Sequence, residues 1–216
     1  MRMATALLVL LCLAACRFDV PLHTTVRIRT ATLTPTGLDF GSGTAFAVAY
    51  TKKGGTLLLT AAHVAAPGDL LAVQIRERKA IERAKLVAWD ATADLALFEI
   101  SVRLPMLVPL GAPPRLGQRV WAITFDMGGK VIVTGIVSTD AIDTCEEKRP
   151  DVKCRLTTLP TGPGYSGAAV VDRRGRLVGL LTAYVKTMPH LGIFVGVETI
   201  IPFLRRHIGG LQVGIQ

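Results

Sequence analysis

Short apolar runs separated by turn residues make up most of the chain. They have the length of strands, are rich in β-branched residues, and are flanked by glycine, proline or charged residues. No long amphipathic helix comes before the C-terminal end. Such runs occupy residues 44–50, 56–60, 70–75, 119–123 and 131–137. The pattern predicts an all-β protein, either a sandwich or a pair of barrels.

A proline-rich stretch interrupts this pattern at residues 104–114. Proline has no N–H for a strand ladder, so we expect a connector between two lobes here. Near the end, a run with Pro202 early and basic residues late predicts a short closing helix. The expected units are an N-terminal tether with a first strand (16–40), a first lobe (41–103), the connector (104–117), a second lobe (118–197), the helix (198–208) and a tail (209–216).

The segment at residues 162–168 contains a lone serine, Ser166, with glycines on both sides. A serine on such a sharp turn can expose its hydroxyl as a nucleophile. The same residues are also compatible with an ordinary tight turn before the apolar run that follows.

Two other interpretations of residues 162–167 fail on their surroundings. The segment spells a dinucleotide-binding fingerprint, but residues 168–181 form two apolar runs around a polar turn, which predicts a β-hairpin rather than a phosphate-binding helix. It also approximates the nucleophile elbow of α/β-hydrolases, in which the acid and then the histidine follow the serine. Only His190 and His207 lie downstream, on too short a remainder.

An isolated histidine and an isolated aspartate precede the serine. His63 ends the apolar run Thr-Ala-Ala-His, and Asp94 begins the run Asp-Leu-Ala-Leu. A serine hydroxyl needs an imidazole to take its proton and a carboxylate to orient that imidazole. Each role therefore has one leading candidate, with Asp90 and Glu99 as rivals for the acid.

These segments together resemble the trypsin-like serine proteases, and most closely the HtrA (Deg) branch of bacterial envelopes. The resemblance extends over about residues 41–204, and it implies two six-stranded antiparallel β-barrels of chymotrypsin type with the active site between them. It implies His63 as general base, Asp94 as its orienting acid and Ser166 as nucleophile, with the N–H groups of Gly164 and Ser166 as the oxyanion hole. Many relatives continue into a PDZ domain, which residues 209–216 are too few to form.

The loop departs from the family pattern at two positions. Tyr165 stands where Asn or Asp is usual, and Ala168 stands where Gly is usual. A tyrosine is expected to cover part of the cleft, and an alanine cannot take a positive φ, which puts the loop's fine geometry in question.

Specificity for Arg or Lys needs an acid six residues before the serine, and that position holds Pro160. The expected substrate-binding residues are uncharged, so we predict cleavage after small or medium apolar residues. They are Thr161, Leu181, Thr182 and Ala183.

The N-terminus predicts export. Arg2 is followed by an apolar run that is too short to span a bilayer, so residues 1–15 are expected to be a signal peptide. Leu13-Ala14-Ala15-Cys16 resembles a lipobox, which implies a lipidated Cys16 and a membrane anchor; simple secretion with cleavage after Ala15 is the alternative. Arg17 follows the cysteine, and this favours anchoring at the outer membrane over the inner membrane of a Gram-negative cell.

The chain has 4 cysteines, of which Cys12 leaves with the leader. Cys145 and Cys154 are expected to form a disulfide, closing a loop of about ten residues worth about 2 to 3 kcal/mol. Two free thiols are the alternative. No histidine is spaced with these cysteines as in a zinc site, so no metal or other cofactor is expected.

The formal charge of +9 favours anionic surroundings but identifies no ligand. Basic residues do not alternate with aromatic residues, which argues against nucleic acid as a partner. We therefore expect an exported, lipid-anchored serine endopeptidase that acts on unfolded or exposed polypeptide. The alternatives are a catalytically silent protease-like fold that binds peptides or proteins, and a purely structural lipoprotein. The sequence does not distinguish a monomer from a trimer.

Overall fold

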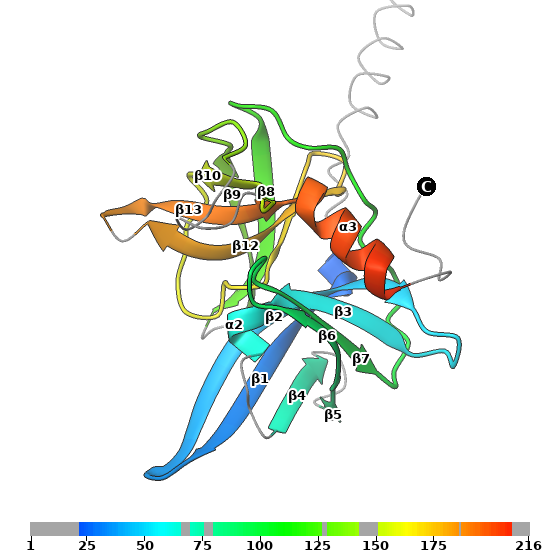
Figure 1. Ribbon diagram of the computed structural model, residues 1–216. Helices are drawn as coiled ribbons and strands as arrows, with labels where there is room; N and C mark the ends of the chain where they lie inside the picture. The colour runs from blue at the N-terminus through cyan, green and yellow to red at the C-terminus, as the bar shows by residue number, and fades with distance from the viewer. Residues whose placement is uncertain are drawn as a thin grey trace, which may run out of the picture.

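The computed structural model describes residues 22–65, 70–75, 80–126, 129–142, 151–185 and 187–208. Two antiparallel sheets account for almost all of its regular structure, and a C-terminal helix packs beside them (Figure 1). The all-β expectation is confirmed, as is a two-lobed architecture.

The first sheet has seven strands, one more than expected, in the order β5-β4-β1-β2-β3-β7-β6. Its two edge strands follow each other in the chain with only Ala84 between them, so the sheet curls back on itself. The extra strand arises because the chain breaks at Ala84, which divides what would be one strand into β5 and β6. The strands are β1 (Thr25–Thr34), β2 (Gly37–Tyr50), β3 (Thr56–Ala61), β4 (Leu70–Ile75), β5 (Ala80–Arg83), β6 (Lys85–Asp90) and β7 (Leu95–Ile100).

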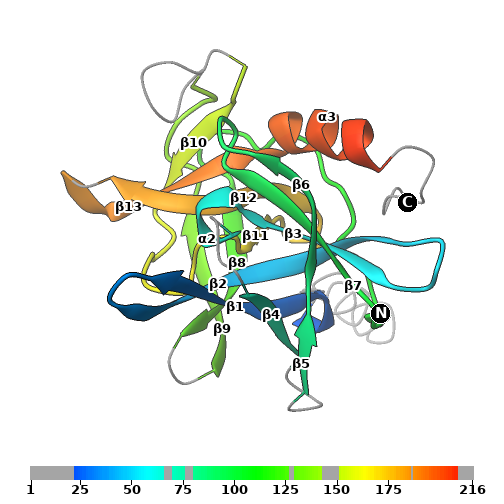
Figure 2. The same cartoon turned by 60° about the horizontal axis from the view of Figure 1, so that its bottom comes forward.

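The expected first-lobe boundary at residue 41 falls inside β2. β1 pairs with β2 over its whole length, from Thr25 opposite Phe46 to Thr34 opposite Gly37. The first lobe therefore begins with β1, just after a short 3-10 helix at Leu22–Thr24. Figures 1 and 2 both show the β1–β2 hairpin projecting from the body of the molecule.

The second sheet has six strands, as expected, in the order β10-β13-β12-β11-β8-β9. Its open edges meet where Ser138 N–H donates to the Leu156 carbonyl and Thr158 N–H donates to the Ile136 carbonyl, at 2.8 and 3.0 Å. The strands are β8 (Arg119–Asp126), β9 (Gly129–Ile136), β10 (Cys154–Thr157), β11 (Ala169–Val171), β12 (Leu177–Val185) and β13 (Met188–Gly196).

Burial explains why continuous apolar runs became central strands. Every residue of β3 is buried, and β7 is buried except at Glu99, because both strands lie inside the first sheet. By contrast, β9 lies at an edge and alternates between exposed and half-buried positions. The hairpin predicted after Ser166 is β11–β12, which pairs Ala169 with Leu180.

The connector between the lobes contains no strand. It is held to the second lobe at Leu110, which forms an isolated parallel bridge with Leu177. Gly111 N–H donates to the Leu177 carbonyl at 2.8 Å, and Leu177 N–H donates to the Pro109 carbonyl at 2.7 Å. A proline-rich segment can still contribute its carbonyls and its few N–H groups in this way.

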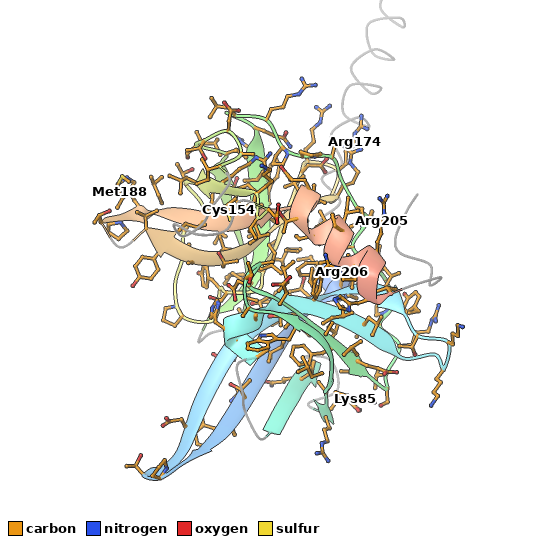
Figure 3. The ribbon with its side chains drawn as sticks, in the orientation of Figure 1. Lys85, Cys154, Arg174, Met188, Arg205 and Arg206 are labelled. Atoms are coloured by element: carbon orange, nitrogen blue, oxygen red, sulfur yellow. The ribbon has the colours of Figure 1, made fainter. Side chains whose placement is uncertain are left out.

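Helix α3 (Val197–His207) begins one residue earlier than expected. Its buried side chains Ile200, Phe203 and Leu204 belong to the same apolar cluster as residues of both sheets. The Arg155 guanidinium of β10 contacts the Glu198 carboxylate in the first helical turn, with 2.6 Å between Nη2 and Oε1. In Figure 3, α3 lies at the end of β12 and β13 that is opposite the outer end of their hairpin, which Met188 marks.

Candidate active site

His63 and Asp94 are held together by both backbone and side-chain bonds. His63 lies on the one-turn helix α2 (Ala62–Ala65), directly after β3. Its Nδ1 is 2.8 Å from Asp94 Oδ2 and 3.1 Å from Oδ1. The His63 backbone N–H also donates to Oδ1 at 2.9 Å, and Ala62 N–H donates to the Asp94 carbonyl at 3.1 Å. One carboxylate thus fixes the position of α2 and the orientation of the imidazole.

The turn that carries Asp94 has unusual backbone geometry. Asp94 has φ +52°, and it is the single non-glycine with a positive φ among the residues that the structure describes. Such a conformation is kept only where surrounding bonds hold it. Here Asp90 Oδ1 accepts the N–H groups of Thr92 and Ala93, both at 2.9 Å. Asp90 therefore supports the turn, and Asp94, not Asp90, contacts the histidine.

Asp94 is less buried than its apolar neighbours suggested. Its side chain is 22% exposed and that of His63 is 49% exposed. The turn presents Asp94 at the wall of a cavity rather than in the core.

Ser166 lies in the loop between β10 and β11. Tyr165 N–H donates to the Gly162 carbonyl at 3.0 Å, and Gly167 N–H donates to the Leu181 carbonyl at 2.7 Å. Gly164 and Gly167 have φ values of +90° and +86°, which favour glycine. Within the described ranges, the N–H groups of Gly164 and Ser166 donate no hydrogen bond. The loop thus leaves these two donors available.

The two departures from the family pattern have different outcomes. Ala168 does not need a positive φ, because that conformation falls one residue earlier, at Gly167. Ala168 is fully buried, and its N–H donates to the Tyr165 carbonyl at 3.1 Å. Tyr165 is half-buried, packs against the second lobe's inner core and lines the cavity. The loop therefore accommodates both residues.

The Ser166 hydroxyl is bonded to a backbone carbonyl and not to His63. It donates to the Thr182 carbonyl of β12 at 3.0 Å. No hydrogen bond between Ser166 and His63 is present in the described part of the chain. A change of the Ser166 rotamer would be needed to bring the hydroxyl to the imidazole, and catalytic hydrogen bonds are often not formed in free enzymes.

One cavity of about 1460 Å³ brings all these groups together. Its walls come from both lobes, and apart from His63 and Asp94 its described lining is uncharged. All the expected substrate-binding residues contribute to it, whereas Pro160 does not. The lining residues are Thr30, Phe40, Gly41, Ser42, His63, Val64, Ala91, Ala93, Asp94, Thr161, Gly162, Pro163, Gly164, Tyr165, Ser166, Leu181, Thr182, Ala183, Tyr184, Val185, Pro189, Ile193 and Val195.

Several lining residues were not foreseen from the sequence. Phe40, 80% exposed, comes from the part of β2 that had been placed in the tether. Tyr184 and Pro189 come from the β12–β13 hairpin, whose length the sequence pattern did not reveal. The available clue in the sequence was a phenylalanine directly before residues 41–46.

Cys154, on β10 (Figure 3), is fully buried and disulfide-bonded. Its expected partner Cys145 lies outside the described residues, as do Cys16 and residues 1–15. The pairing and the lipid anchor therefore stay predictions.

In the described residues, no three or more His, Cys, Asp or Glu side chains are grouped so that they could hold a metal ion. None of the helices in that part of the chain has the length and apolar character needed to cross a membrane.

Residues 41–180 match the family model of the trypsin-like peptidase domain. The chain belongs to this family. Relatives include a "probable periplasmic serine endoprotease DegP-like" of Pseudomonas fluorescens, 34% identical over 67% of this chain, and a "serine protease Do-like HtrA" of Lactobacillus helveticus, 29% identical over 65%. The chain spans about a third of their length, 30% and 34% respectively.

Solved structures of proteases share this fold. The Rv3671c protease of M. tuberculosis in its active form superposes with a TM-score of 0.73 at 19% identity, covering 94% of this chain and 86% of that one. The HtrA-type protease AlgW with a tripeptide gives the same TM-score at 25% identity, covering 87% and 61%.

Proposed function

We propose that this chain is a serine endopeptidase that hydrolyses unfolded or exposed polypeptide. The observation that carries the proposal is the cavity between the lobes, lined by His63, Asp94 and Ser166, in which the Asp94 carboxylate already orients the imidazole. Membership of the trypsin-like peptidase family supports the same activity.

In the first half of the reaction, Ser166 Oγ turns from the Thr182 carbonyl toward His63. His63 Nε2 takes the hydroxyl proton while Oγ attacks the carbonyl carbon of the scissile bond. The developing oxyanion is met by the N–H groups of Gly164 and Ser166. Asp94 stabilises the imidazolium that forms, through the bond at Nδ1.

In the second half, the imidazolium gives its proton to the leaving amine, and the C–N bond breaks to leave an ester on Ser166 Oγ. Water then attacks this acyl-enzyme, and His63 accepts the proton from the water. Collapse of the second tetrahedral intermediate releases the acid and returns the proton to Oγ.

The cavity favours an extended, uncharged stretch of peptide. It is larger than the pockets that hold a single small molecule. Thr161, Leu181 and Ala183 place no charge near the serine loop, so residues of small or medium apolar side chain are expected before the cleaved bond. In a peptide library, a dominant preference for Arg or Lys would contradict this specificity.

A catalytically silent peptide-binding protein is the second candidate. The hydrogen bond from Ser166 Oγ to the Thr182 carbonyl favours this candidate. It uses the hydroxyl proton, so the hydroxyl does not donate to the His63 imidazole.

Labelling with a fluorophosphonate probe separates the two candidates. The leaderless protein and its Ser166→Ala variant are treated side by side after their folding has been verified by circular dichroism. Attachment at Ser166 that disappears in the variant supports the endopeptidase. A folded protein that stays unlabelled, but retains peptides, supports the silent binder.

We also propose that the chain is exported to the periplasm and anchored to the outer membrane by a lipid on Cys16. Support comes from the leader-like residues 1–15 and from the word "periplasmic" in the name of the Pseudomonas relative. Mass spectrometry of the N-terminal peptide tests this: an acylated Cys16 is expected, and an unmodified cysteine would indicate simple secretion.

The disulfide between Cys145 and Cys154 is proposed to rigidify a rim of the active site. The exported protein is alkylated with and without prior reduction, and the two masses are compared. The reduced sample should be heavier by two alkyl groups. An identical mass would contradict the bridge.

A further inference from the structure

Two fully buried threonines, one from each lobe, meet beneath the Ser166 loop. Thr44 lies on β2 of the first lobe, and Thr124 lies on β8 of the second lobe. Their Oγ1 atoms are 3.1 Å apart. The contact thus joins the lobes through a pair of polar side chains.

A fully buried hydroxyl group, as in Thr44 and Thr124, needs a hydrogen-bond partner. Burying a hydroxyl costs free energy unless it forms hydrogen bonds, and valine has nearly the same shape and suits a strand equally well. The neighbours of these threonines along their strands, Ala45 and Ile123, are themselves apolar and fully buried. The hydroxyls must therefore have a partner that a methyl group could not replace.

That partner is the carbonyl of Gly164. Thr44 Oγ1 donates to it at 2.8 Å, and Thr124 Oγ1 lies 3.3 Å from it. Each hydroxyl has one proton, so the shorter bond belongs to Thr44, and the Thr124 proton serves either the carbonyl or Thr44 Oγ1. In both cases the Gly164 carbonyl is held toward the interior.

Thr44 holds a second carbonyl of the loop as well. Its backbone N–H donates to the Ser166 carbonyl at 2.9 Å. Thr44 thus bonds the carbonyls of the two residues whose N–H groups remain available, Gly164 and Ser166. Without such bonds a loop with glycines at 162, 164 and 167 could rotate its peptide groups easily.

The loop also packs closely against β8. A Cβ at Gly164 would lie 2.6 Å from the carbonyl oxygen of Phe125, the residue after Thr124. Gly164 is therefore confined from one side by Phe125 and from the other by the two hydroxyls.

We propose that Thr44 and Thr124 are positioning residues for the oxyanion hole. They hold inward the carbonyl of the Gly164–Tyr165 peptide group. This group lies between the two peptide groups that carry the Gly164 and Ser166 N–H donors, so fixing it keeps both donors directed to the reacting carbonyl. The inference rests on the proposed endopeptidase function. It also makes the geometry of the hole depend on the contact between the lobes, because the threonines come from different sheets.

Thr44→Val and Thr124→Val test the pair, with Thr44→Ser and Thr124→Ser as conservative variants that keep the hydroxyl. Thr56→Val is the matched control: Thr56 is also fully buried, but its side chain bonds Val102 and Leu104 rather than the serine loop. The readouts are the rate of fluorophosphonate labelling at Ser166, kcat and KM on one peptide, and the unfolding temperature.

The valine variants are expected to label and turn over about 10 to 100 times more slowly with little change in KM, since a misplaced donor acts on the transition state. The serine variants should recover most of this loss. Thr56→Val should lower the unfolding temperature and leave kcat unaffected. Should Thr44→Val fail to fold, Thr124→Val still gives the test, with an expected loss at the lower end of this range because Thr44 keeps its bond to Gly164.

Two outcomes overturn the proposal, and they are distinguishable. If the unmodified protein is not labelled, the endopeptidase function fails and this inference fails with it. If the unmodified protein is labelled and folded valine variants keep its kcat and labelling rate, the threonines are structural and only this inference fails.

Discussion

At the scale of single residues, Asp94 combines two functions that have different requirements. Its carboxylate must reach both Nδ1 and the backbone N–H of His63, and its backbone must adopt φ +52° to do so. An L-residue adopts this conformation only when neighbouring bonds stabilise it. The bonds from Thr92 and Ala93 to Asp90 provide that stabilisation.

Asp90→Ala is therefore expected to reduce kcat/KM by about tenfold or more through a displaced Asp94. Asp90→Asn keeps an oxygen that accepts the same two N–H groups, so it should stay close to the unmodified protein. Steady-state kinetics on one peptide across a range of pH compares the two. Equal activity of the alanine variant would show that the turn holds Asp94 without Asp90.

At the scale of elements, the β11–β12 turn is organised around one buried acid. Asp172 Oδ1 accepts the N–H groups of Arg174 and Arg176 at 2.8 and 3.0 Å, and Oδ2 accepts Nη2 and Nε of Arg176 at 2.7 and 2.9 Å. Burial raises the pKa of Asp172, but the hydrogen bonds and charge of Arg176, with the Arg174 N–H, outweigh it and hold that pKa below its usual value.

A lowered pKa in the folded state gives the sign of the pH dependence. The stabilisation is complete above the usual pKa of an aspartate, about 3.9, and is lost as pH falls through the lower folded value. Asp172→Asn should reduce the free energy of unfolding by about 1 to 3 kcal/mol at pH 7. Urea unfolding at pH 7 and pH 3 should show a smaller difference between the proteins in acid. A difference that does not depend on pH would contradict the ionised pair.

Elements also show what the sequence could and could not predict. The apolar run of β3 was recognisable as a strand because β3 is buried on both faces. β1 lies in the unit expected to hold a tether and a first strand, but that unit was placed outside the first lobe because the local pattern did not show its pairing with β2. The site residues were found by family resemblance, whereas the Thr44–Thr124 contact depends on how two lobes dock, which no local pattern specifies.

At the scale of the whole molecule, the core crosses the boundary between the lobes. One cluster of buried side chains includes Leu58 of the first lobe, Leu180 of the second, Leu104 of the connector and Phe203 of α3. A second cluster lies inside the second lobe alone. A shared core predicts that both lobes unfold together.

Calorimetry of the leaderless protein should therefore give a single transition, with calorimetric and van't Hoff enthalpies in agreement. Phe203→Ala should lower that transition as a whole, because removal of a buried phenylalanine costs about 3 to 5 kcal/mol. Two separate transitions, or a variant in which only one part melts earlier, would contradict a common core.

The division of the cavity between the lobes has a consequence during synthesis. His63 and Asp94 leave the ribosome well before Ser166, and the threonine pair beneath the serine loop also needs both lobes. A nascent or truncated product that ends in the connector therefore carries the base and the acid without a nucleophile. In the proposed peptidase, hydrolytic capacity would arise only after nearly the whole polypeptide has been made, which protects the cell that makes it from partial products.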